Sequence, residues 1–147
     1  MASDFDLQLF EQQLVEVRQL EDASRWQLER ETEFPLGLLA VMYSAKDPSQ
    51  LYKARFRWTD LFGPFSLKFI DIETGGDTNP RAWPRCTGFA PQSLFACIPL
   101  TVEGHFHHPE WVRSAATRFP ATNVPLQFAL LSVQHILDSS YEGRCTQ

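Results

Sequence analysis

The sequence predicts a single-domain α+β fold. A helical pattern opens the chain, period-two alternation follows in the middle, and a second helical pattern comes near the end. Helices that flank a run of strands, instead of alternating with them, are typical of an α+β fold with an antiparallel sheet. The length of 147 residues suits one domain with a sizeable core, so we expect residues 1–147 to fold as one unit.

The first predicted element is a helix from Asp4 to Arg30. Its apolar residues recur at helical spacing with charges between them, namely Leu7, Phe10, Leu14, Val17 and Leu28. Ser3 or Asp4 can cap its beginning, and Pro35 prevents any continuation.

Three strands are predicted next. Leu36 to Ala45 is an apolar run, while Tyr52 to Thr59 and Phe65 to Ile72 alternate between apolar and polar residues. Turn residues separate them at Asp47-Pro48-Ser49 and at Gly63-Pro64. Short connections of this kind favour an antiparallel β-meander.

The rest of the chain combines an irregular segment with C-terminal helices. Gly75 to Pro91 is rich in proline and glycine, with room for one short strand around Arg85 to Phe89. A short helix can begin at Pro109, and Pro125 to Asp138 has the wide apolar face of a closing helix. The polar residues 139–147 predict a loose tail.

Composition limits the classes of partner and compartment. The net charge is −5 and the basic residues are scattered, which argues against nucleic acid and against an anionic membrane as partners. No apolar run approaches the length of a membrane span, and the N-terminus lacks the pattern of a secretory signal. Three cysteines without regular spacing do not suggest a disulfide framework, so we expect a cytoplasmic protein.

Reactive side chains are densest between Cys97 and His108. This stretch holds one cysteine and three of the four histidines, His105, His107 and His108. A thiolate is a strong nucleophile, and an imidazole can act as its base or stabilise an oxyanion. In a strand, His105 and His107 would share a face, which makes either one the first candidate to assist Cys97. The alternatives are a cysteine packed in its apolar run and histidines that serve only a polar loop.

A zinc site is a second possibility for the same residues. Cys86, Cys97, His105 and His107 have suitable ligand chemistry, although their spacing matches no known zinc finger. Cys86 is otherwise expected to pack in a strand, and Cys145 is expected to be an exposed thiol in the polar tail.

The order of elements and several short stretches resemble the ubiquitin-conjugating enzyme fold. Phe65 to Ile70 is similar to the third strand of that family, and Pro80 to Phe89 is similar to the proline-rich turn that leads into its fourth strand. Val124 to Leu137 resembles the helix that follows the active site, with its Leu-Leu-Ser-Val-Gln stretch. Ser93 to Leu100 is similar to the segment around the thioester cysteine, which corresponds to Cys97.

One departure from the family concerns the His-Pro-Asn motif that normally precedes the cysteine. Residues 86–96 contain neither His nor Asn, and the histidines instead follow Cys97. This arrangement resembles divergent prokaryotic conjugating enzymes, which also carry a histidine downstream of the cysteine. The missing Asn makes His105 and His107 the candidates to stabilise an oxyanion.

The resemblance implies a transferase that accepts a ubiquitin-like modifier as a thioester on Cys97 and passes it to an amine. The implied partners are an activating enzyme and the modifier, the target protein is not specified, and no small-molecule cofactor is required. The alternative on the same fold is a non-catalytic binding or adaptor module that has lost the chemistry.

Overall fold

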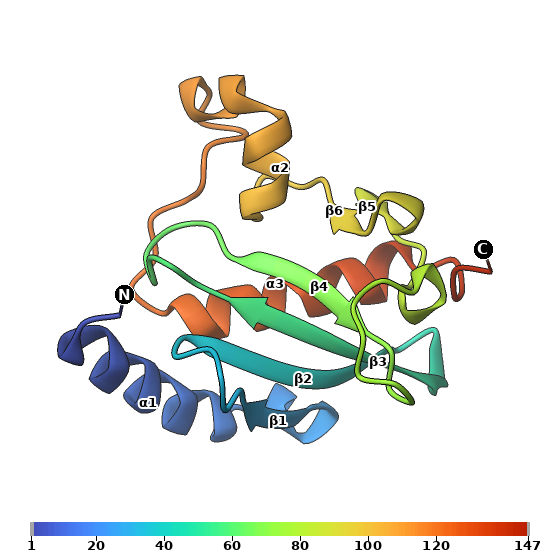
Figure 1. Cartoon of the computed structure of the whole chain (residues 1–147), viewed down its shortest axis with the longest axis horizontal. Helices are drawn as coiled ribbons and strands as arrows, with labels where there is room; N and C mark the ends of the chain where they lie inside the picture. The colour runs from blue at the N-terminus through green and yellow to red at the C-terminus, as the bar shows by residue number, and fades with distance from the viewer. Residues whose placement is uncertain (1, 147) are drawn as a thin grey trace.

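The computed structural model describes residues 2–146, and Figure 1 shows an antiparallel sheet with a long helix across its back. The helices and strands are α1 (Asp4–Arg18), β1 (Gln27–Arg30), β2 (Gly37–Ser44), β3 (Asp47–Arg57), β4 (Ser66–Ile70), β5 (Phe89–Ala90), β6 (Phe95–Ala96), α2 (Val102–His107) and α3 (Pro125–Ser140). Single-turn 3-10 helices occupy η1 (Glu21–Arg25), η2 (Pro80–Ala82), η3 (Pro91–Ser93) and η4 (Pro109–Arg113). The predicted α+β class is confirmed. No helix within residues 2–146 is both long enough and apolar enough to cross a bilayer.

The N-terminal helix is shorter than predicted. Ser3 caps α1 by accepting a hydrogen bond from the Asp6 amide, as expected, but the helix ends at Arg18. The predicted continuation to Arg30 is wrong, because the last residues of that range form β1 and pair with β2. Burial of Trp26, whose indole nitrogen donates to Gln134 Oε1 at 2.8 Å, fixes the chain in this extended path.

The sheet is a four-stranded meander in the order β1-β2-β3-β4, with every neighbouring pair antiparallel. The three predicted strands are present as β2, β3 and β4, and β1 adds a fourth at the edge. The predicted turn at Asp47-Pro48-Ser49 is displaced: Asp47 already pairs with Ser44, and the chain reverses at Ala45 and Lys46. The reversal is held in part by the Lys46 amide, which donates to Ser44 Oγ.

The core lies between the inner face of the sheet and α3, with α1 packed beside α3. Alternate residues of β2, β3 and β4 point inward, and they are Leu38, Ala40, Met42, Tyr52, Ala54, Phe56, Leu67 and Phe69. They meet one face of α3, formed by Leu126, Ala129, Leu130, Val133 and Leu137. Full burial of each large apolar side chain contributes about 1.5–3 kcal/mol, so this contact dominates the stability of the fold.

The predicted loose tail is wrong for the part of residues 139–147 that the structure describes. Tyr141 and Cys145 are buried, and the Tyr141 hydroxyl lies 2.7 Å from that of Tyr52. The Cys145 amide donates to the Trp83 carbonyl at 2.9 Å, so the tail pairs with the segment before β5. Cys145 is therefore not the exposed thiol that the polar sequence around it suggests. The final residue of the predicted tail lies outside the described residues.

Candidate functional site

Cys97 follows a small β-hairpin that is separate from the main sheet. In this hairpin β5 pairs with β6, Phe89 opposite Ala96, and the Cys97 amide donates to the Gly88 carbonyl at 2.7 Å. The short strand expected around Arg85 to Phe89 is thus displaced to β5. It does not extend the meander, because its partner is β6.

The side chain of Cys97 is directed outward. Ala96 is fully buried and Ile98 is 7% exposed, so the alternate positions Phe95 and Cys97 lie on the opposite, outer side of the chain. Cys97 is half-buried and is a free thiol. The alternative of a packed cysteine requires Cys97 to lie in the core. The structure does not place it there.

A buried threonine connects the cysteine segment to α2. The Thr101 hydroxyl donates to the Ala96 carbonyl at 2.6 Å and accepts from the Gly104 amide at 3.0 Å, which caps the helix. A Cβ atom at Gly104 would lie 2.3 Å from the Ile98 carbonyl oxygen, so only glycine allows this close approach. The segment that contains Cys97 is accordingly one compact unit with the start of α2.

His105 and His107 lie in a helix, so the prediction that they share a face of a strand is wrong. Two residues apart in α2, they point in different directions. His105 Nε2 lies 2.5 Å from the Pro99 carbonyl oxygen. Because a carbonyl can only accept, Nε2 carries the proton and its role is to hold the loop. The ring also meets the edge of Trp111 at a centroid distance of 5.6 Å.

His107 is the histidine that contacts the hairpin before Cys97. Its exposed ring packs against Phe95 in a tilted arrangement with centroids 4.7 Å apart, and Phe95 is two residues before Cys97. His108 instead stacks on Trp111 at 4.3 Å. Of the three histidines, His107 is the one whose ring packs against the hairpin that leads to Cys97.

The proposed zinc ligands do not come together. Within residues 2–146, no group of three or more His, Cys, Asp or Glu side chains is arranged to hold a metal ion. Cys86 packs against the core near α3 instead, and burial raises the pKa of Cys86 to about 12. The zinc alternative built from Cys86, Cys97, His105 and His107 has no support in this geometry.

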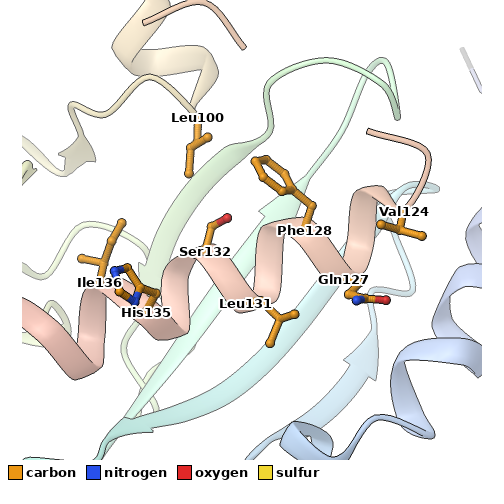
Figure 2. A pocket seen from close by; sticks show the side chains of 8 residues that line it. All are labelled: Leu100, Val124, Gln127, Phe128, Leu131, Ser132, His135 and Ile136. Carbon is orange, nitrogen blue, oxygen red and sulfur yellow. The ribbon is translucent and has the colours of Figure 1, made fainter. Parts of the chain in front are cut away.

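An apolar groove lies beside the loop that carries the cysteine (Figure 2). Its volume is about 490 Å³, and it is lined by Leu100, Val124, Gln127, Phe128, Leu131, Ser132, His135 and Ile136. The sequence prediction missed this groove. A signal was present, because α3 carries Phe128 and Leu131 in addition to its core face, and a helix with apolar residues on several faces has more than one contact to make.

Comparison of the chain with protein-family models, curated proteins and solved structures finds no match. The chemistry of the site is therefore inferred from its own residues. They provide a half-buried thiol directly after the hairpin, an exposed imidazole packed against Phe95 of the same hairpin, and an apolar groove next to the same loop.

Proposed function

We propose that this chain is a divergent ubiquitin-conjugating-like enzyme that carries a ubiquitin-like modifier as a thioester on Cys97. The observation that carries the proposal is the outward position of Cys97 in a segment held by backbone and Thr101 hydrogen bonds. The order of elements supports it. A helix, an antiparallel meander, a cysteine segment and a closing helix follow one another as the family resemblance implies.

The proposed chemistry is two successive acyl transfers. The Cys97 thiolate attacks the carbonyl carbon of the thioester between the modifier's C-terminus and the activating enzyme, whose own sulfur leaves as a thiolate. A neutral amine of the target then attacks the new thioester. The C–N bond forms, the bond to the Cys97 sulfur breaks, and the nitrogen gives up a proton. No small-molecule cofactor takes part in either step.

His107 is the proposed assistant in these transfers. Its exposed ring is free to accept the proton that the amine gives up, or to donate a hydrogen bond to the oxyanion that the missing Asn would serve. His105 is assigned a different role, because its Nε2–H is already engaged by Pro99. It holds the loop after Cys97 in place.

The apolar groove supports the proposal as a path for the modifier's tail. Leu100 lines the groove and belongs to the same loop as Cys97, and α3 forms the opposite wall. An extended C-terminal tail that reaches a thiol needs a neighbouring surface to hold it, and apolar walls are typical of ligand grooves.

A charging assay tests the proposal. The protein is mixed with ATP, a ubiquitin-like modifier and the activating enzyme of that modifier, and the products are separated on a non-reducing gel. We expect a thiol-sensitive adduct that Cys97→Ala abolishes and Cys86→Ala retains. The absence of an adduct, or an adduct that survives Cys97→Ala, would contradict the proposal. Non-covalent binding of the modifier without charging would identify the adaptor alternative.

A further inference from the structure

The turn of the cysteine hairpin contains a strained residue. Leu94 has φ 61° and ψ 36°, and it is the single non-glycine residue with a positive φ between residues 2 and 146. A side chain with a Cβ is disfavoured by about 1–2 kcal/mol in this left-handed region. Leu94 immediately precedes β6, so its conformation sets the direction in which the chain leaves toward Cys97.

Lys68 of β4 holds this residue. Its ammonium group donates to the Leu94 carbonyl oxygen at 2.6 Å in a half-buried contact. A hydrogen bond from a charged donor is about twice as strong as a neutral one, so it can offset the strain at the turn. The hairpin needs such support, because its two strands have two residues each and an isolated two-stranded hairpin is only marginally stable.

The outer face of the sheet shows how specific this contact is. Lys68 lies opposite Arg55 there, and the two arginines of that face pair with carboxylates: Arg55 with Asp77 at 3.1 Å and Arg57 with Glu31 at 2.7 Å. Lys68 instead donates a hydrogen bond to a backbone carbonyl of the hairpin. The same strand also holds the other end of the cysteine segment.

That second attachment lies just after Cys97. The Phe65 amide donates to the Leu100 carbonyl at 3.2 Å, and the Ser66 hydroxyl donates to Glu103 Oε2 at 2.5 Å. β4 and the residue that precedes it therefore bind the segment on both sides of the thiol, through Lys68 before it and through these two contacts after it.

We infer that Lys68 is a positioning residue for Cys97, acting through the strained turn at Leu94. The effect on catalysis rests on the proposed function, in which the Cys97 thiol carries the acyl group and must be correctly oriented. Lys68 acts through its hydrogen bond to the Leu94 carbonyl and not through the thiol itself. Its loss should release the turn, let β6 separate from β5, and leave Cys97 without a fixed direction.

Hydrogen exchange of the backbone amides tests the inference without any partner protein. In Lys68→Met we expect the Cys97 amide, which donates to the Gly88 carbonyl across the hairpin, to exchange about tenfold faster, because a charge-assisted hydrogen bond is lost locally. Lys68→Arg should restore the slow exchange. The matched control is Lys53→Met, which removes the same charge from a side chain that lines a hollow with Leu39 and Val41. Unchanged exchange in Lys68→Met, or an equal increase in Lys53→Met, would overturn the inference.

A double-mutant cycle checks the route through Leu94. Glycine adopts a positive φ without strain, so in a Leu94→Gly background the turn no longer needs its anchor. We expect Lys68→Met to accelerate exchange by less than threefold there. An effect of the original size would show that Lys68 acts elsewhere and would overturn the inference.

A kinetic comparison separates this inference from the proposed function. If the protein charges, Lys68→Met should lower kcat for discharge to an amine about tenfold with KM for the amine unchanged, and Lys68→Arg should recover it. If Cys97 does not charge at all, the proposed function fails, while the exchange measurements still decide whether Lys68 holds the hairpin. If Cys97 charges and Lys68→Met exchanges and discharges normally, the inference alone fails.

Discussion

Cys86 and Cys97 lie at the two ends of one segment and have opposite surroundings. Cys86 packs against the hydrophobic core, and desolvation raises its pKa to about 12. Cys97 directly follows the hairpin, and Phe95, two residues before it, packs against His107. Both thiols are half-buried, so the difference is one of direction and neighbours. It shows that a cysteine's chemistry depends on which side of the local chain packs against the core.

The largest expected effect is a difference in alkylation rate. With a pKa of about 12, about one Cys86 side chain in ten thousand is ionised at pH 8. We expect iodoacetamide to modify Cys97 at least about a hundredfold faster than Cys86 at this pH, as measured by peptide mass spectrometry. In 8 M urea, where both thiols are exposed, the two rates should become similar. Comparable alkylation rates in the folded protein would contradict the difference in surroundings between Cys86 and Cys97.

The second largest expected effect is a difference in discharge rate between the His107 and His105 variants. His107→Ala should slow discharge of the thioester about a hundredfold, because a positioned acid–base group typically contributes at least that much. His105→Ala should mainly lower the melting temperature, since it removes the hydrogen bond to Pro99. The measurement is single-turnover discharge to free lysine, together with thermal unfolding of each variant. The reverse result, with His105→Ala as the slow variant, would contradict the assignment of His107.

A third effect tests the glycine between the two thiols. Gly88 and Gly75 both have a positive φ, but a Cβ at Gly88 would lie 2.5 Å from Ile98 Cγ2, whereas nothing lies within 4 Å at Gly75. Both alanine variants lose the freedom of glycine, and Gly88→Ala must also displace a packed side chain. We expect urea unfolding to show a loss of about 2–3 kcal/mol for Gly88→Ala and about 1 kcal/mol for Gly75→Ala. Equal losses would mean that the hairpin is not packed closely against Ile98.

The smallest effect concerns Asp138, which anchors α3 to Arg25 and to the backbone after β2. Its carboxylate accepts from Arg25, Gln134 and the Ala45 amide, and the Arg25 guanidinium is the main cause that lowers the pKa of Asp138. Asp138→Asn should cost about 1–2 kcal/mol at pH 7 and leave alkylation of Cys97 unchanged.

The Asp138 carboxyl also predicts how the free energy of unfolding changes with pH. A carboxyl whose pKa is lowered by folding stabilises the folded state above its ordinary pKa of 3.8, and this contribution disappears as the pH falls through the lowered value. The stability difference between wild type and Asp138→Asn should therefore be constant from about pH 5 to 7 and shrink below about pH 4. A difference that grows on acidification would contradict the assigned ion pair.

The parts of the fold with a clear period could be predicted from the sequence. The alternation around Phe56 predicted β3, and the apolar face around Leu130 predicted α3, because one-sided burial imposes those periods. The strand β1 could not be predicted in this way. Charged residues such as Glu29 suit a helix, and they form a strand only because β2 offers a partner.

The candidate site could be predicted in composition but not in geometry. Cys97 was identified from its residue type and context, yet the direction of its side chain follows from burial of Ala96. Thr101 is the N-cap of the helix that carries His105 and His107, and a threonine at this position is a sequence indication of a helix start. The apolar residues before it favoured the interpretation as a strand. Arg144 illustrates the same limit in the tail, because its partners, Gln50 and the Leu51 carbonyl, are distant in sequence.

The most direct test of the central claim locates the acyl group on the charged protein. Intact-mass analysis after incubation with ATP, the activating enzyme and the modifier should show one added modifier minus one water. Peptide mapping should place it on Cys97, and a thiol reductant should remove it. Attachment to Cys86 or to a lysine, or no added mass in a preparation whose activating enzyme is itself charged, would contradict the account.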